Sequence, residues 1–277
     1  MGGVVLDIST LLPFVGFLLV VGAFAGVLAG LLGVGGGIVL VPAFYYVFQQ
    51  LGYAGPQLMQ VCVATSLATI IVTSLRSVRA HHRKGAVALA ILRTWAPGIV
   101  LGAGASVVVA NQLRSDVMVV IFACLALSVA AYMGLSKDHW RLADEMPKGV
   151  RRGAMSIGVG FLSVLMGIGG GGIAVPLMKL HGRSIHNAVG TAAGFGLLIA
   201  VPGVIGFLLS PGGAGVPPGT VGLVNLPAFA IIVAMTTFTT PLGVNLAHRL
   251  DPGVLKRVFA AFLFLVALNM IRKVVMG

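Results

Sequence analysis

Two very long stretches of this chain contain no charged residue. The first lies between Asp7 and Arg76, and the second, with histidine counted as neutral, lies between Arg183 and Arg249. A helix needs about 20 apolar residues to cross the hydrocarbon core of a bilayer, so each stretch can hold about three crossings. Backbone groups in lipid must be satisfied internally, which favours helices. These stretches predict an all-α, polytopic membrane protein.

The rest of the composition excludes several other classes. Only 9% of the residues are charged and 58% are hydrophobic, whereas a soluble domain carries about 25% charged residues. A membrane β-barrel would show short alternating segments instead. The net charge of +12 does not indicate nucleic acid, because Lys and Arg gather in short loops beside apolar segments. Cys62 and Cys124 both lie within apolar segments and make no metal spacing, so we expect no metal and no cofactor.

The apolar segments predict a series of membrane helices and half-helices. They lie at 12–32, 36–50, 57–75, 86–110, 116–135, 153–166, 172–180, 187–209, 220–246 and 256–272.

The loops between these segments predict how the chain is oriented. Basic loops are typical of the cytoplasmic side, and the basic loops here are 76–85, 136–152 and 248–257. The loops at 50–57 and 210–220 carry no charge and are expected outside, as is the nearly neutral loop at 111–116 by alternation. We therefore expect a multi-pass protein of the cell inner membrane. The N-terminal residues lack a basic region and a cleavage pattern, and we expect them to be mature sequence rather than a signal peptide.

A glycine-rich box occurs twice in the chain. Residues 31–42 read "LLGVGGGIVLVP" and residues 165–176 read "LMGIGGGGIAVP". A further basic stretch, "KLHGRSIHN" at 179–187, follows the second box and is also expected inside. The segment between the linker and this stretch therefore enters and leaves on one side. At about 1.5 Å per residue it is too short for two full crossings of a core about 30 Å thick.

The side of the membrane on which the chain enters and leaves each box predicts two repeats of opposite topology. The first repeat is 1–135, the cytoplasmic linker is 136–152 and the second repeat is 153–277. Each repeat is expected to hold about four to five membrane segments, with broken or re-entrant helices at the glycine boxes. Inverted repeats with helices broken near the midplane are typical of secondary transporters.

The glycine runs predict helix ends with free amides. Helices that start near Ile38 and Ile173 would aim unpaired N–H groups and the positive ends of their dipoles at the membrane centre. Two such ends form an anion site without a fixed charge. The candidate ligands are the glycine residues Gly35, Gly36, Gly37, Gly169, Gly170 and Gly171.

The alternative for glycine in membrane helices is close packing. Glycines at four-residue spacing fit that interpretation, and they form the sets Gly22/Gly26/Gly30, Gly98/Gly102 and Gly190/Gly194.

The duplicated box resembles that of a known family. "GVGGGIVLVP" and "GIGGGGIAVP" in a basic polytopic chain are similar to the TauE/SafE sulfite exporter-like family, also called the toluenesulfonate uptake permease family. Both halves carry the box, so the resemblance covers essentially the whole chain. "ATS" at 64–66 is similar to the polar stretch of the family, whereas the second half has "GTA" at 190–192. The resemblance implies transport of small sulfur-containing or carboxylate anions such as sulfite, sulfoacetate or related organosulfonates.

Four further side chains are candidates for binding the anion. Thr65, Ser66 and Thr191 can donate hydroxyl hydrogen bonds to it, or bond a carbonyl one turn back. Arg93 lies within an apolar segment, where it can pair with a sulfonate or carboxylate, or snorkel to the headgroups. His81 is expected to be a solvated loop residue.

These features together predict a secondary transporter, not an enzyme, which exports a small anion by alternating access. An anion-selective channel and a non-transporting sensor or assembly subunit are the alternatives. Acidic residues lie at segment ends or in loops, so export can run on the membrane potential, with sodium coupling as the other option. The expected partners are the anion and membrane lipid, not nucleic acid, and a homodimer remains open.

Overall fold

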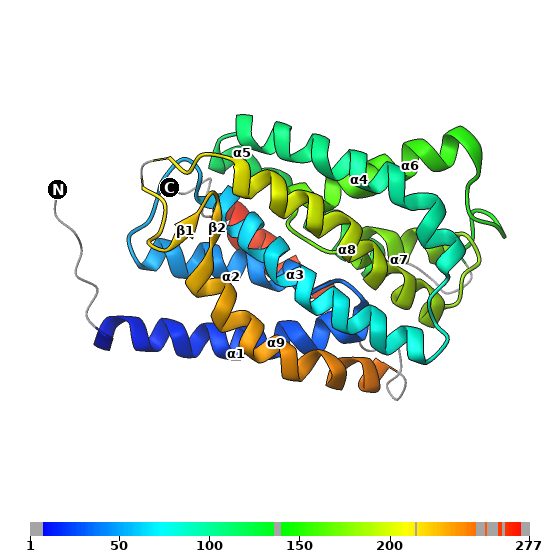
Figure 1. The fold of residues 1–277 in the computed structure, drawn as a ribbon, viewed down its shortest axis with the longest axis horizontal. Helices are drawn as coiled ribbons and strands as arrows, with labels where there is room; N and C mark the ends of the chain where they lie inside the picture. The colour runs from blue at the N-terminus through cyan, green and yellow to red at the C-terminus, as the bar shows by residue number, and fades with distance from the viewer. Residues whose placement is uncertain are drawn as a thin grey trace.

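A computed structural model describes residues 8–135, 140–213, 215–247, 253, 260–261 and 264–272 (Figure 1). Helices dominate these residues, and six of them are long and apolar enough to cross a membrane. The predicted all-α, polytopic fold is confirmed. The elements are α1 (Ile8–Leu32), α2 (Gly37–Gln50), α3 (Leu58–Arg83), α4 (Leu89–Gln112), α5 (Ser115–Leu135), α6 (Gly149–Leu165), α7 (Gly171–Leu180), α8 (Ile185–Leu209), β1 (Thr220–Val221), β2 (Val224–Asn225) and α9 (Leu226–Ala247).

The predicted segments coincide with these helices except at two places. Helix α3 continues to Arg83, through most of the predicted loop at 76–85. No glycine or proline interrupts it before Gly85, whose φ of 69° follows the helix end. The predicted helix at 220–246 begins instead with a short β-hairpin, because Gly219 and Gly222 take positive φ values. Most of the predicted loop at 248–257 and part of the last segment lie outside the described residues.

The long helices form a row. Helices α3 and α8 pack against each other at its centre, α9 packs on α3, and α4 packs on α8. Helix α1 then lies along α9, and α6 lies along α4, so that the order from bottom to top of Figure 1 is α1 and α9, α3, α8, then α4 and α6. Each half of the chain thus supplies the outer partner of a helix from the other half.

The three loops expected outside meet at one end of the bundle. Ser115 N donates to Pro56 O at 3.0 Å, which joins the α4–α5 turn to the α2–α3 loop. Asn111 Nδ2 donates to Ser210 Oγ at 2.6 Å, which joins the same turn to the end of α8.

Described parts of the basic segments meet at the other end. Asn187 Nδ2 donates to Ala86 O at 3.4 Å, and Leu142 N donates to Leu180 O at 2.8 Å. The second bond brings the linker before α6 to the end of α7. The segment with the second glycine box therefore enters and leaves at the same end of the molecule.

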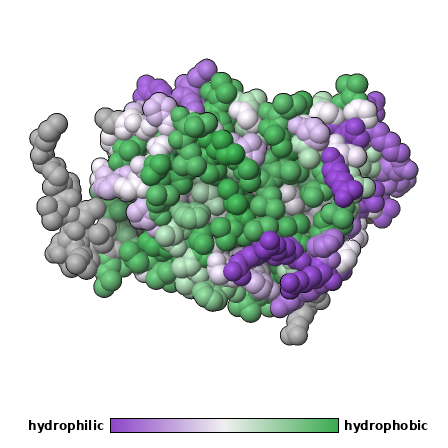
Figure 2. Space-filling view, in the orientation of Figure 1, coloured by the Kyte–Doolittle hydropathy of each residue, from purple (hydrophilic) through white to green (hydrophobic). Residues whose placement is uncertain are grey.

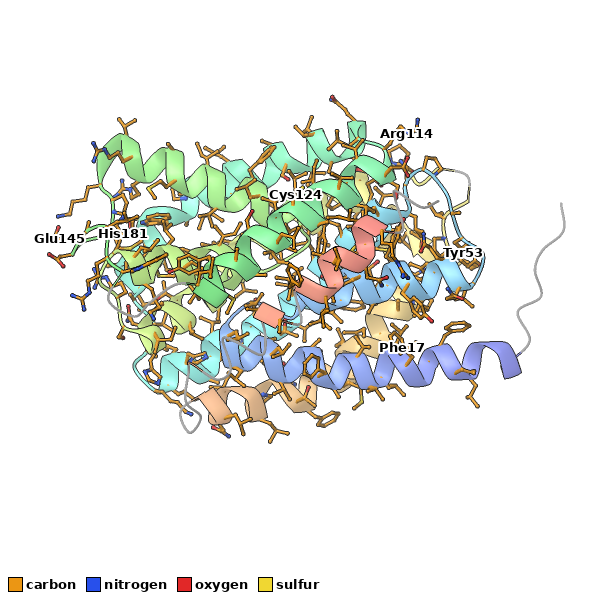
Figure 3. The ribbon with its side chains drawn as sticks, turned by 180° about the vertical axis from the view of Figure 1, so that it is seen from behind. Phe17, Tyr53, Arg114, Cys124, Glu145 and His181 are labelled. Carbon is orange, nitrogen blue, oxygen red and sulfur yellow. The ribbon has the colours of Figure 1, made fainter. Side chains whose placement is uncertain are left out.

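The two sets of loops lie at opposite ends. In Figure 3, Tyr53 and Arg114 mark one end, and Glu145 and His181 mark the other. Figure 2 shows a broad apolar surface between the ends, with hydrophilic residues gathered where the α3–α4 turn lies. Large apolar side chains are exposed along the helices, for example Leu101 at 66% and Phe238 at 74%. Such a surface suits a lipid environment, as the long uncharged stretches predict.

The glycines at four-residue spacing lie at helix crossings, as the packing interpretation predicts. A Cβ at Gly26 of α1 would lie 2.9 Å from the Cα of Thr236 in α9, and one at Gly102 of α4 would lie 2.8 Å from the carbonyl carbon of Ile157 in α6. Only glycine permits such close approach of two helix backbones. In both pairs, α1–α9 and α4–α6, glycine therefore allows the two helix backbones to pack closely.

Candidate functional site: two broken helices in contact

Each glycine box interrupts a helix. Helix α1 ends at Leu32 and α2 begins at Gly37, while α6 ends at Leu165 and α7 begins at Gly171. Residues in the left-handed region separate the helices in both places, with φ of 75° at Gly35 and 60° at Gly167. Side chains disfavour this conformation, which explains the glycine runs. Both helices start one or two residues earlier than the sequence predicts.

The two breaks touch each other in the interior. Gly169 N donates to Val34 O at 3.0 Å, so the backbone of the second break bonds directly to that of the first. A Cβ at Gly171 would lie 2.5 Å from the carbonyl carbon and oxygen of Gly33. All residues from 33 to 41 and from 163 to 172 are buried. The structure thus brings together the six predicted glycine ligands from two distant parts of the chain.

The helices that leave the breaks begin with uncapped amides. In α2 the first bonds run from Val39 N and Leu40 N to Gly36 O, and in α7 the first runs from Ala174 N to Gly170 O. Neither described helix start receives a hydrogen bond from a capping side chain. The amides ahead of these bonds, together with the helix dipoles, provide two electropositive ends that suit an anion.

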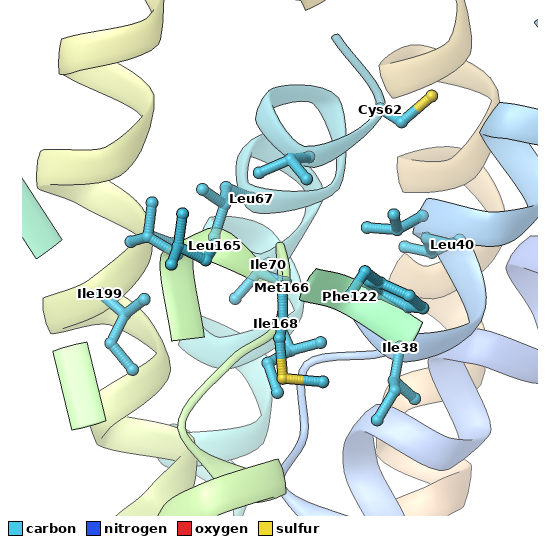
Figure 4. Close-up of a cluster of buried hydrophobic side chains, with 14 of the residues drawn as sticks. Ile38, Leu40, Cys62, Leu67, Ile70, Phe122, Leu165, Met166, Ile168 and Ile199 are labelled. Carbon is cyan, nitrogen blue, oxygen red and sulfur yellow. The ribbon is translucent and has the colours of Figure 1, made fainter. Parts of the chain in front are cut away.

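Apolar side chains surround the breaks in this structure. Figure 4 shows Ile38, Ile70, Phe122, Met166 and Ile168 around the crossing, and all five are buried. These side chains enclose the amides, which are closed off from solvent in this structure. These amides become accessible only when the surrounding helices separate.

Ser66 is the predicted side chain that lies at the crossing. Its Oγ donates to Gly167 O at 2.7 Å, and a Cβ at Gly37 would lie 2.8 Å from that Oγ. The corresponding position in the second half is Ala192, which has no hydroxyl, and its carbonyl oxygen lies 2.7 Å from a Cβ built at Gly170. The polar side chain at the crossing therefore comes from the first half.

Thr65 and Thr191 bond elsewhere, and they do so in matching ways. Thr65 Oγ1 accepts a hydrogen bond from Asn225 N at 2.9 Å, directly ahead of α9. Thr191 Oγ1 accepts one from Ala88 N at 2.9 Å, directly ahead of α4. Each hydroxyl thus holds the start of a helix from the other half of the chain. Neither bonds a carbonyl one turn back, the alternative considered from the sequence.

Arg93 does not approach the breaks. It lies in α4, one turn after the helix start at Leu89, and its side chain is exposed on the outer surface. That position matches the snorkelling alternative better than a place beside the glycine segments.

Two buried residues near the site are not anticipated by the sequence. His81, expected in a solvated loop, is fully buried in the last turn of α3, with Nε2 3.2 Å from Gly30 O of α1. Asn225 is 2% exposed, and its Oδ1 accepts from Ala228 N at 3.0 Å, which caps α9. Their burial depends on helices far away in sequence, so local composition carries no signal for it.

The described residues hold no group of three His, Cys, Asp or Glu side chains that could bind a metal ion. The groups that the structure places at the crossing are backbone amides, helix dipoles and the hydroxyls of Ser66 and Thr73.

Comparisons with known proteins place this architecture among membrane transporters. The family model described as "Sulfite exporter TauE/SafE" matches residues 18–270. A "Probable membrane transporter protein" of Haemophilus influenzae is 36% identical over 263 residues, which cover 94% of this chain and 99% of that protein. A protein with the same kind of name from Methanocaldococcus jannaschii is 25% identical over 260 residues, which cover 92% of this chain and 94% of that protein. No solved structure matches significantly.

Proposed function

The chain belongs to the TauE/SafE sulfite exporter family, and we propose that this multi-pass membrane transporter exports small sulfur-containing or carboxylate anions. Sulfite, sulfoacetate and related organosulfonates are the substrates of this proposal, and the bacterial inner membrane is its location. The observation that carries it is the contact, deep in the bundle, between two glycine breaks that each lead into an uncapped helix N-terminus. Such ends bind anions through backbone amides and dipoles, so no fixed charge is needed.

The anion site consists of the glycine amides and Ser66. Gly35–Gly37 and Gly169–Gly171 lie at the crossing. The Gly169 amide reaches the anion once its bond to Val34 O breaks, and the Ser66 hydroxyl turns from Gly167 O toward the bound anion. Thr65 and Thr191 support the helices around this site, since their oxygens accept hydrogen bonds from helix-start amides. Arg93 contacts lipid headgroups in this scheme.

Alternating access of two inverted repeats moves the anion. The reciprocal packing of α1 on α9 and of α6 on α4 supports this scheme, as does the matching use of Thr65 and Thr191. In secondary transporters, one bundle rocks against the other around a fixed midplane site. The enclosed breaks correspond to an occluded stage of such a cycle.

The end that carries the α3–α4 turn faces the cytoplasm. Arg79, Arg83 and Lys84 are exposed there, and positive residues in short loops favour the cytoplasmic side. The interior-negative potential then drives export, because a monovalent anion that leaves gains about 2.3 kcal/mol per 100 mV. The described acidic residues Asp116, Asp144 and Glu145 lie at helix starts or in loops, which agrees with transport that does not depend on a buried carboxylate.

Sulfite counterflow in proteoliposomes tests the function. Purified protein is reconstituted with unlabelled sulfite inside, and uptake of radiolabelled sulfite is followed after dilution. A carrier gives transient accumulation of label above equilibrium, whereas an anion channel gives flux without accelerated exchange. No flux above protein-free liposomes with sulfite, sulfoacetate and simple carboxylates would contradict the proposal and favour a sensor or assembly role.

A further inference from the structure

One face of α3 carries a buried row of polar side chains that begins at the crossing of the breaks. Ser66, Thr73, Ser77 and His81 recur at helical spacing, so they lie on the same side of the helix. Each is 0% or 1% exposed. Ile70 is the apolar member of the row, between Ser66 and Thr73, and it packs against Gly35.

The bonds of this row show what it faces. Thr73 Oγ1 donates to Gly35 O of the first break at 3.1 Å, and His81 Nε2 lies 3.2 Å from Gly30 O in the last turn of α1. The row therefore runs from the glycine crossing, along the end of α1, to the end of the bundle that carries the α3–α4 turn.

Ser77 lies in this row between Thr73 and His81, and its hydroxyl has no hydrogen-bond partner among the described residues. Burying a hydroxyl without a hydrogen-bond partner costs free energy, so an unpaired hydroxyl here suits a residue that meets water or an anion in another state of the protein. Thr73 and His81 bond carbonyls of the first break and of α1, so a movement of α1 away from α3 would break these bonds and open this face of α3 to water.

The corresponding face of α8 is different. The positions that match Thr73, Ser77 and His81 are Ile199, Gly203 and Phe207. Ile199 and Phe207 are fully buried, and a Cβ at Gly203 would lie 3.0 Å from Leu67 Cδ1 and 3.4 Å from Val164 Cγ2. At these three positions, the face of α8 is thus closed by apolar contacts and carries no hydroxyl.

From this asymmetry we propose that Thr73, Ser77 and His81 line the cytoplasmic half of the anion path. This rests on the proposed function and extends it. The path opens when α1, together with α9, moves away from α3 and breaks the contacts of Thr73 with Gly35 O and of His81 with Gly30 O. The row then supplies hydroxyl and imidazole donors to an anion that moves from the cytoplasm to the glycine amides.

Thiol labelling from the cytoplasmic side tests this path. Ser77→Cys and Ile199→Cys are made in a background with Cys62 and Cys124 replaced by alanine. Inside-out vesicles are treated with a small membrane-impermeant sulfonated maleimide, whose thioether adduct sulfite does not cleave. We expect labelling of Ser77→Cys at least tenfold faster than that of Ile199→Cys. Reconstituted after labelling, Ser77→Cys loses sulfite flux by at least tenfold, and Ile199→Cys keeps it.

A pair of histidine variants provides a second test of this path. His81→Gln is expected to lower the initial rate of sulfite flux about tenfold while sulfite still shifts the thermal midpoint. His82→Gln, in the same turn but exposed, is expected to keep the rate within twofold. Full flux in His81→Gln, or labelling of Ser77→Cys no faster than that of Ile199→Cys in protein that transports sulfite, would overturn the path. Loss of flux in the unmodified protein would overturn the proposed function instead.

Discussion

Neighbouring residues of α3 have different roles because their side chains point to different elements. Thr65 bonds the amide ahead of α9, whereas Ser66 bonds the carbonyl of Gly167 in the second break. The sequence marks both as polar residues in an apolar segment, so it predicts that they have partners. It cannot say which partners, because those lie more than a hundred residues away along the chain.

Ser66→Ala is expected to weaken sulfite binding about tenfold. A hydrogen bond to a charged ligand contributes about 1.5–3 kcal/mol, and a tenfold change in the dissociation constant corresponds to about 1.4 kcal/mol. Sulfite affinity is measured by titration of the thermal midpoint in detergent. Ser128→Ala is the control, since Ser128 is exposed and bonds only Cys124 O in its own helix. Equal affinities in the two variants would remove Ser66 from the site.

Thr65→Val and Thr191→Val are expected to lower stability rather than affinity. Each leaves a helix-start amide without its acceptor, at a cost of about 1–3 kcal/mol. The thermal midpoint should fall in both variants and stay unchanged in Thr94→Val, because Thr94 is exposed and bonds only backbone carbonyls of its own helix. A weaker sulfite affinity with an unchanged thermal midpoint would instead mean that these threonines bind the anion.

At the scale of helices, the glycine runs could be read directly from the sequence. Consecutive glycines do not form a packing stripe, and they fall where loop charges leave too few residues for two crossings, so the breaks at 33–36 and 166–170 were predictable. The end of α3 at Arg83 could not be predicted in the same way. Basic residues are compatible with a helix, so they indicate where the chain leaves the membrane but not where the helix ends. The burial of His81 follows from the docking of α1 and α8 around it.

Gly102→Ala is expected to destabilise the α4–α6 pair. Its methyl group would lie 2.8 Å from the carbonyl carbon of Ile157, whereas a Cβ at Gly104 in the same helix meets nothing within 4 Å. Gly104→Ala should keep or raise the thermal midpoint, since alanine favours a helix over glycine by up to about 1 kcal/mol. The paired midpoints check this directly. Equal behaviour of the two variants would mean that the crossing is looser than described.

At the scale of the whole molecule, the sequence predicts a multi-pass bundle and the grouping of its loops, and both are found. Hydropathy and loop charge decide these features because the bilayer limits what can span it. The central place of α3 and α8 in the row depends on side-chain shape at helix crossings between distant parts of the chain. The packing of α1 on α9 and of α6 on α4 depends on it in the same way. The apolar seal around the breaks depends on the same packing, so it could not be predicted from the sequence.

Arginine-to-cysteine variants test the orientation of the bundle. Arg83 and Arg114 are both exposed, one at each end of the molecule. In intact cells, an impermeant thiol reagent should label Arg114→Cys and spare Arg83→Cys, because the α3–α4 end faces the cytoplasm. In inside-out vesicles the pattern should reverse. Labelling of Arg83→Cys from outside would invert the proposed direction of the path along α3.

In the proposed site, two broken helices hold the anion with their first amides. Selenite is an analogue of sulfite with an anomalous scatterer, so crystals grown with it locate the anion directly. We expect one selenium peak between the start of α2 and the start of α7, within hydrogen-bond reach of the amides of Gly37 and Gly171. In protein that transports sulfite, a selenium peak elsewhere, with the glycine breaks still empty, would contradict the account.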